Sequence, residues 1–188
     1  MKKSTDIRVI KTQKALLCAL DELIKTKKLS NITITELCTK ANINRNTFYY
    51  HYNNIYDLLA EYKQILMNEF TSVLDVNKQR HSHTGLEICK IIYRHPNFMS
   101  IIISPNCDLD YFDEIFGLAS ETSRIYMDKK HEIKTTADHL ACTYCNAGCI
   151  AVVRDWIAGG LKETPEEITN IVSQASRKGP ISMLFPNE

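Results

Sequence analysis

The side chains with the clearest chemistry lie between residues 45 and 51, in the run Arg-Asn-Thr-Phe-Tyr-Tyr-His. Arg, Asn and Thr carry donors, acceptors and methyl groups that can meet base edges in the major groove of DNA. If the run is helical, a step of about 100° per residue separates Phe48 from an outward face. That face comprises Arg45, Asn46, Thr47, Tyr49 and Tyr50. The run therefore predicts a DNA-reading surface, and the alternative is an ordinary polar helix face whose aromatic residues pack on a neighbouring helix.

Phosphate contacts are expected beside the base contacts. Tyr49, Tyr50 and His51 are long enough to reach the sugar-phosphate backbone. The backbone N–H groups at the start of the same helix favour phosphate as well.

The segment before this run has the pattern of a short helix that positions it. Thr33 and Glu36 form a Thr-x-x-Glu capping box, which can satisfy backbone donors at a helix start. One buried stripe follows at the i, i+3, i+4 and i+7 positions: Ile34, Leu37, Cys38 and Ala41. Thr35, Thr39 and Lys40 face away from that stripe.

The connection between the two predicted helices contains residues suited to a tight turn. Asn42 can adopt the left-handed conformation that glycine often supplies, and Asn44 is a good helix N-cap. Ile43 and Phe48 then occupy the positions of a hydrophobic staple, and Phe48 and Tyr52 point inward. Cap, turn, staple and outward face agree, which favours a helix-turn-helix DNA reader.

Charge is distributed unevenly along the 188 residues, although the formal net charge is only +1. Residues 1–60 hold ten Lys and Arg against five Asp and Glu, and residues 61–188 hold thirteen against seventeen. A basic N-terminal third is expected when one end of a chain meets a polyanion. Five basic residues there suit either a phosphate-facing edge or a solvated helix face: Lys2, Lys3, Arg8, Lys11 and Lys14.

Length and composition predict a cytoplasmic, all-α protein of one compact unit or two closely packed ones. The sequence lacks an apolar run long enough to span a bilayer and lacks a signal-peptide pattern at its start. Seven cysteines without the spacing of a small disulfide scaffold argue against a secreted framework.

Helical periodicity continues through the rest of the chain without the alternation that marks strands. Helices are expected over residues 7–26, with Leu16, Leu20, Leu23 and Ile24 buried, and over residues 55–78. The second of these carries Leu58, Leu59, Tyr62, Ile65, Leu66, Phe70 and Val73 on its apolar side. Residues 81–83 suggest a loop, and Pro96, Pro105 and Gly117 are expected to break or bend the helices that follow.

Residues 135–158 predict a helix that is apolar nearly all round in its middle and is therefore covered on several sides. Its small residues Ala141, Cys145 and Gly148 would let another helix approach closely, and Trp156 adds a large buried surface. Gly159-Gly160 can end this helix, and Thr164-Pro165-Glu166-Glu167 starts another with a capping box. The pair forms a helical hairpin, suited either to a dimer interface or to a monomeric core.

These residues together resemble the tetracycline-repressor (TetR) family of bacterial transcriptional regulators. The matching segments are Thr33-Ile34, Leu37-Cys38, Ala41-Asn42-Ile43-Asn44, Thr47-Phe48-Tyr49-Tyr50-His51-Tyr52 and Leu58-Leu59. The resemblance implies a three-helix DNA-binding domain at residues 1–54 and a helical effector-binding and dimerisation domain at residues 55–188. It implies base contacts by Arg45, Asn46, Thr47 and Tyr50. It implies phosphate contacts or positioning by Thr33, Thr35, Tyr49 and His51, and Asn44 completes the DNA-binding set as the cap of the second helix.

Two positions depart from the family pattern. Asn42 stands where the turn usually has Gly, which the turn can accept. Ile55 stands where a phosphate-contacting Lys is common, and the loss of that contact is expected to weaken non-specific affinity.

The resemblance also implies the partners. A homodimer would place two recognition helices in successive major grooves of an inverted-repeat operator. A small molecule in the C-terminal domain would change operator affinity through its different affinity for two arrangements, with repression as the default. Some residues are suited to line its pocket, but packing in a helical core is favoured for each of them: Tyr93, Phe98, Met99, Phe112, Phe116 and Tyr144. Residues 144–164 further resemble a subgroup that includes regulators of dihydroxyacetone metabolism, which does not assign a pathway.

The main alternative in chemistry is a metal or redox sensor, because His139, Cys142, Cys145 and Cys149 share one helix face. One straight helix cannot wrap a tetrahedral metal, so no metal or cofactor is expected without a dimer. The sequence lacks a phosphate-binding glycine loop, a nucleophile elbow and a paired-histidine motif, and we expect no enzyme. A protein-binding adaptor or coactivator of the same fold remains a further alternative.

Overall fold

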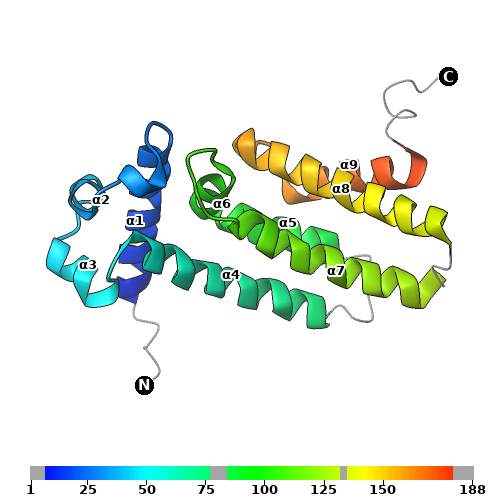
Figure 1. Ribbon diagram of the computed structural model, residues 1–188, viewed down its shortest axis with the longest axis horizontal. Helices are drawn as coiled ribbons and strands as arrows, with labels where there is room; N and C mark the ends of the chain where they lie inside the picture. The colour runs from blue at the N-terminus through cyan, green and yellow to red at the C-terminus, as the bar shows by residue number, and fades with distance from the viewer. Residues whose placement is uncertain (1–6, 77–83, 132–134, 180–188) are drawn as a thin grey trace. The chain divides into compact units, whose positions relative to one another are not determined.

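The computed structural model describes residues 7–76, 84–131 and 135–179, with the side chains of residues 75, 76 and 122–131 left out (Figure 1). Within these ranges every regular element is helical, which confirms the all-α prediction. The helices are α1 Ile7–Ile24, α2 Ile34–Ala41, α3 Arg45–His51, α4 Ile55–Val76, α5 Thr84–Arg94, α6 Pro96–Ile103, α7 Tyr111–His131, α8 Thr136–Ala158 and α9 Pro165–Lys178. A short 3-10 turn, η1, spans Leu29–Asn31. The loop predicted at residues 81–83 lies outside the described residues.

Contacts divide the chain into two units that are not the two halves of the sequence. The first unit joins Met1–Leu66 to Asn97–Tyr111, and the second joins Met67–Pro96 to Phe112–Glu188. Helices α1, α2, α3 and α6 therefore belong to the first unit, together with the start of α4. The functional division after residue 54 stays a prediction.

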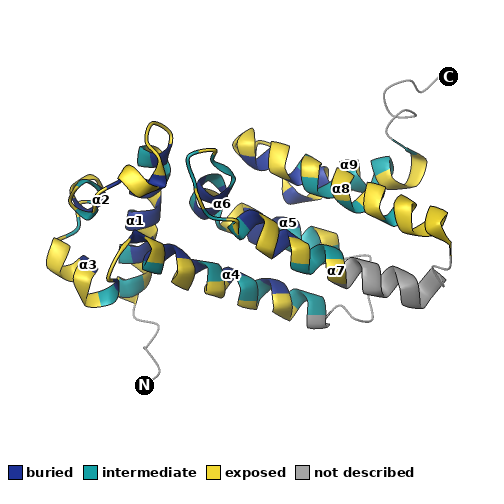
Figure 2. Ribbon diagram, in the orientation of Figure 1, coloured by how far each residue is buried: buried dark blue, intermediate teal, exposed yellow. Residues whose placement is uncertain are grey.

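The core of the first unit forms where α1, α2, α3 and the start of α4 bury their apolar sides (Figure 2). Leu16, Leu20 and Ile24 of α1 are buried as predicted, whereas Leu23 is only half-buried. Two positions differ from expectation: α1 ends at Ile24 rather than Thr26, and Ile65 of α4 is 37% exposed. The spacing of apolar residues predicts which side of a helix is buried. Whether a residue at the edge of that side is buried depends on the elements that pack beside it.

The second unit is built around the packing of α9 against α5 and α8. Its buried residues include Ile91, Ile92, Phe112, Phe116, Trp156, Ile157 and Ile168. The rings of Phe112 and Phe116 stack with centroids 4.4 Å apart, and Phe116 meets Phe70 edge-on at 6.0 Å. Helix α7 continues through Gly117 without interruption, so the expected break there is wrong. Pro96 begins α6, as an N-terminal proline can, and Pro105 follows its end.

The predicted helical hairpin is present, and its caps explain its limits. Thr164 and Glu167 form a capping box at the start of α9, with Pro165 in the first turn. Helix α8 ends at Ala158 with Gly159 as its C-cap, and the left-handed φ of +86° at Gly160 turns the chain away. A second capping box, between Thr135 and Asp138, starts α8.

The middle of α8 differs from the sequence prediction. Leu140 is 60% exposed and Tyr144 is 67% exposed, and a side chain added at Gly148 would meet no described atom within 4 Å. Among the described residues, therefore, this apolar stretch is not covered on several sides (Figure 2). None of the described helices is long and apolar enough to cross a membrane.

Candidate nucleic-acid interface

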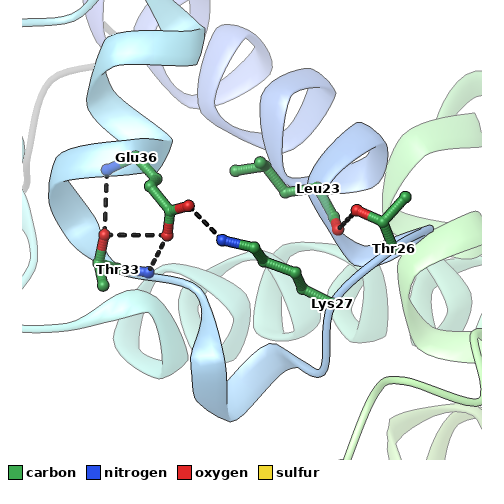
Figure 3. Close-up of polar contacts among 5 residues, drawn as sticks. All are labelled: Leu23, Thr26, Lys27, Thr33 and Glu36. Atoms are coloured by element: carbon green, nitrogen blue, oxygen red, sulfur yellow. Dashed lines mark hydrogen bonds and ion pairs between the residues drawn. The ribbon is translucent and has the colours of Figure 1, made fainter.

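The start of α2 is fixed by the predicted capping box, drawn in Figure 3. The Thr33 hydroxyl accepts a hydrogen bond from the Glu36 N–H at 3.2 Å, and the Glu36 carboxylate accepts one from the Thr33 N–H at 3.2 Å. The same carboxylate pairs with the ammonium group of Lys27, which follows α1. The Lys27 ion pair and the Thr33 hydrogen bonds lower the pKa of Glu36 below its usual value. The box therefore caps α2 and also ties it to the segment after α1.

The turn between α2 and α3 has the predicted geometry. Asn42 adopts the left-handed conformation, with φ 54° and ψ 42°. The N–H of Ile43 donates to the carbonyl of Cys38 at 2.9 Å, so the end of α2 is closed within the turn. Asn44 caps α3 by accepting a hydrogen bond from the Asn46 N–H at 2.8 Å. Both turn predictions are confirmed; contact between Ile43 and Phe48 stays a prediction.

The inward side of α3 is anchored by two aromatic residues. Phe48 is fully buried and Tyr52 nearly so, with ring centroids 5.5 Å apart. The Tyr52 hydroxyl accepts a hydrogen bond at 3.3 Å from the side chain of Gln13, the one buried polar residue of the described core. Burial raises the pKa of Tyr52 to about 12. Gln13 was not identified from the sequence, although it lies on the same helical stripe as Leu16, Leu17 and Leu20.

The outward side of α3 presents the predicted reading residues to solvent. Arg45, Asn46 and Thr47 are exposed, Tyr49 is 55% exposed and Tyr50 is 81% exposed. His51 is half-buried and its ring meets that of Tyr50 edge-on, with centroids 4.9 Å apart. Because Phe48 and Tyr52 anchor the inward side of α3, the helix that carries this outward face is held in place. Base and phosphate contacts by these residues remain predictions.

Some predicted site residues have partners within the unit. The guanidinium of Arg45 donates to the Thr35 hydroxyl at 3.2 Å, which brings the start of α3 to the first turn of α2. Thr33 uses its hydroxyl in the capping box, accepting from the Glu36 N–H and donating to its carboxylate at 3.1 Å. The Thr33 hydroxyl therefore caps α2 and the Thr35 hydroxyl accepts a hydrogen bond from Arg45, while the roles of both residues toward DNA stay predictions.

Several basic side chains near the reading face are already paired. Lys27 pairs with Glu36, and Lys40 with Glu22 at 2.6 Å, so each ion pair joins α2 to α1 or to the segment after it. Of the five basic residues considered for a phosphate-facing edge, Arg8, Lys11 and Lys14 are exposed on α1, and Lys2 and Lys3 lie outside the described residues.

The residues considered for a ligand pocket do not all belong to one unit. Phe112 and Phe116 are buried in its core, whereas Tyr93 and Tyr144 are 47% and 67% exposed. Phe98 and Met99 belong to the core of the first unit. An open pocket in the second unit is lined instead by Asn68, Glu69, Ser72, Val73, Ile91 and Arg94. Of these residues, sequence periodicity singled out only Val73, because most of the others are polar.

The cysteine face of α8 is accessible. Cys145 is exposed, Cys142 and Cys149 are half-buried, and the Cys149 sulfur lies 3.7 Å from the Ser176 hydroxyl. His139, one turn before Cys142 on the same helix, is exposed as well. In the described part of the chain, His, Cys, Asp and Glu side chains form no group of three or more that could hold a metal ion.

Comparison with known proteins identifies the class of the molecule. A family model described as a transcriptional regulator C-terminal region, of the TetR type, matches residues 81–178, which is more than half of the chain. A 58-residue segment is 45% identical to the uncharacterized HTH-type transcriptional regulator YxbF of Bacillus subtilis (strain 168). That segment is 30% of this chain but only 15% of the length of that relative.

Three solved structures share the fold. The dihydroxyacetone kinase operon activator DhaS is 20% identical, with a TM-score of 0.53 over 88% of this chain and 93% of its own. A transcriptional regulator of the TerR/AcrR family from Aquifex aeolicus VF5 is 15% identical, with a TM-score of 0.61 over 86% and 95%. The fatty acid degradation regulator FadR from Bacillus halodurans is 12% identical, with a TM-score of 0.59 over 90% and 96%. The helix-turn-helix geometry, the all-α fold and the family match agree, and the chain belongs to the TetR family of transcriptional regulators.

Proposed function

We propose that the protein is a homodimeric, sequence-specific DNA-binding regulator that acts in the cytoplasm. The observation that carries this proposal is the outward face of α3, where exposed polar and aromatic residues stand on a helix anchored by Phe48 and Tyr52. Arg45, Asn46, Thr47 and Tyr50 would contact base edges. Tyr49 and His51 would contact phosphates, while Thr33, Thr35 and Asn44 would hold the two helices in place.

The second copy in the dimer would cover the middle of α8. This stretch combines exposed Leu140 and Tyr144 with an open surface at Gly148, and the adjoining α9 exposes 40% of Ile171. Exposed apolar side chains of this size on adjacent helices are typical of a surface that a partner covers. A two-fold dimer would present two copies of α3, and its operator would be an inverted repeat.

Small-molecule control would act through the second unit, where the open pocket lined by Asn68, Ser72 and Arg94 among others is one place for an effector to bind. The effector would change operator affinity only by binding one arrangement of the dimer better than the other. We take repression as the default direction; one relative is named an operon activator, so a reporter measurement with and without the gene decides the direction.

Fluorescence anisotropy tests the central proposal. The full-length protein is titrated onto its own upstream DNA and onto a scrambled duplex, at several salt concentrations. We expect tight binding to the upstream DNA that weakens with salt, and weaker binding to the scrambled duplex. Sequence-blind binding would contradict recognition of that site, and no binding at low salt would favour the protein-binding adaptor.

A double variant tests the assigned reading face. Arg45→Ala with Tyr50→Ala removes two exposed side chains, so helix content and dimerisation are expected to stay unchanged. Loss of the base contacts is expected to lower operator affinity by roughly 100-fold, because each good contact contributes about 1–3 kcal/mol. Arg177→Ala on α9 is the charge-matched control, and unchanged operator binding by the double variant would refute the reading face.

A further inference from the structure

The loop after α6 is hydrogen-bonded to the end of α1, although the two are far apart in the sequence. The side-chain N–H of Asn106 donates to the backbone carbonyl of Ile24 at 2.7 Å, across a separation of 82 residues. The backbone carbonyl of Asn106 accepts a hydrogen bond from the N–H of Leu29 at 2.8 Å. One residue thus contacts both ends of the connection between α1 and η1.

The two backbone groups that Asn106 satisfies are ones that a helix end leaves open. Ile24 is the last residue of α1, and carbonyls in the last turn of a helix have no partner within that helix. Leu29 begins η1, which leads through Ile32 to the capping box of α2. Asn106 therefore acts as a C-terminal cap for α1 and fixes the segment from which α2 starts.

Neighbouring contacts hold the same loop and helix against the start of α4. The Tyr56 hydroxyl donates to the Asp108 carboxylate at 3.0 Å, and the rings of Tyr62 and Phe98 lie 5.0 Å apart. Within the loop, the Asn106 N–H donates to the Ser104 hydroxyl oxygen at 3.2 Å, which shapes the turn. Residues 97–111 accordingly belong to the same compact unit as the helix-turn-helix.

We infer that Asn106 is a positioning residue for DNA recognition, acting from outside the helix-turn-helix sequence. By capping α1 and holding Leu29, it keeps the α1–α2 connection in the one arrangement that supports α3. Without its side chain the Ile24 carbonyl loses its partner, and other arrangements of the connection become populated. Operator affinity falls with the fraction of molecules in the competent arrangement. This role rests on the proposed function, since it requires that α3 reads DNA.

The test compares the full-length wild type with Asn106→Ala at a temperature well below the unfolding midpoint of both, established by circular dichroism. We expect operator affinity to fall roughly tenfold, equivalent to about 1.4 kcal/mol. Affinity for a scrambled duplex is expected to change by less than about twofold, because non-specific binding depends on charge. Amide exchange at Leu29 is expected to become faster. A merely structural role would lower the unfolding temperature without changing the ratio of the two affinities.

Asn97→Ala, the same substitution in α6, is the matched control and is expected to leave operator affinity unchanged. A wild type that binds its operator and an Asn106→Ala variant that binds equally well would overturn the inference alone. A wild type without operator binding would overturn the proposed function and this role with it.

A conservative variant covers the case in which Asn106→Ala does not keep its helix content. Tyr56→Phe then removes only the hydrogen bond to Asp108 in the same loop. A drop in operator affinity of at least roughly threefold supports the inference, because a hydrogen bond to a charged group such as the Asp108 carboxylate contributes about 1.5–3 kcal/mol. Unchanged operator affinity overturns it.

Discussion

Arg45 begins α3, and its guanidinium donates to the hydroxyl of Thr35 on α2. An arginine that is held before it meets DNA loses less side-chain entropy when it binds a base edge. Thr35 can thus contribute to recognition through Arg45 rather than through a phosphate. The two roles predict different losses of DNA affinity when the Thr35 hydroxyl is removed, because base contacts carry sequence information and phosphate contacts do not.

Thr35→Val separates the two roles by removing the hydroxyl while keeping the side-chain shape. If Thr35 positions Arg45, operator affinity is expected to fall by roughly three- to tenfold while affinity for a scrambled duplex is unchanged. Thr39→Val, an exposed threonine of the same helix, is the matched control. Equal losses on both duplexes would instead assign Thr35 to a phosphate.

Tyr52 and Gln13 form the buried polar contact beneath α3. Tyr52→Phe leaves the Gln13 amide without its partner, and the free energy of unfolding is expected to fall by about 1–3 kcal/mol. Tyr50→Phe, at an exposed position, is the control and is expected to have no effect on stability. Urea denaturation of the two variants checks this, and equal stability would contradict a role for the contact.

Tyr52 also gives the protein a predicted alkaline instability. Because the folded pKa is about 12 and the ordinary value is 10.0, the unfolded chain ionises first as pH rises. The stabilising contribution is complete below pH 10 and is lost as pH rises through about 12. In Tyr52→Phe, the free energy of unfolding is expected to fall less steeply with pH in this range. An unchanged slope would show that other groups cause the alkaline loss of stability.

At the scale of the elements, the capping box of α2 is the most direct test of local sequence chemistry. Thr33→Ala removes the cap and is expected to lower the free energy of unfolding by about 1 kcal/mol. Thr39→Ala, in the exposed middle of the same helix, is the control. Denaturation midpoints at pH 7 check the difference, and equal midpoints would contradict a stabilising cap.

The Glu36 side of the box predicts a pH dependence. The folded pKa of Glu36 lies below its ordinary value of 4.5, so its contribution to stability is present above pH 4.5 and is lost as pH falls through the folded pKa. Glu36→Gln is expected to reduce the loss of stability between roughly pH 6 and pH 3, the range in which carboxylates titrate. Unchanged acid sensitivity would show that other carboxylates, such as Glu22, dominate.

The elements that could be predicted from sequence are those determined by nearby residues. The capping boxes, the left-handed Asn42 and the cap by Asn44 each involve residues within a few positions of one another, and all are present. Exposure of the α3 face followed from periodicity alone. Local chemistry was therefore sufficient for the helix-turn-helix.

Contacts between distant segments could not be predicted in the same way. The hydrogen bond from Asn106 to Ile24 and the ion pair of Lys27 with Glu36 depend on how separate elements pack. The exposure of Ile65 depends on such packing as well. Hydrophobic periodicity gives the direction of a buried side but not the identity of its neighbour.

At the scale of the whole molecule, the uncovered middle of α8 connects the proposed dimer to DNA binding. A single helix-turn-helix unit contacts one half-site, whereas a dimer contacts two half-sites in one binding event. A substitution that prevents dimerisation is therefore expected to lower operator affinity even though α3 is untouched. The apolar composition of α8 alone also fits a monomeric core, and the exposure of Leu140 and Tyr144 supports the dimer.

Leu140→Glu with Tyr144→Glu places two charges on this surface. Burial of unpaired carboxylates at an interface is costly, so the variant is expected to sediment as a monomer while its helix content is retained. Operator affinity is expected to fall by at least roughly 100-fold, in line with the gain that linking two sites provides. Lys162→Glu, which lowers the net charge by the same amount at an exposed position outside α8 and α9, is the control for charge. If the α8 variant sediments like the wild type, α8 is not the dimer interface; if it is monomeric but binds its operator equally well, recognition does not require two copies of α3.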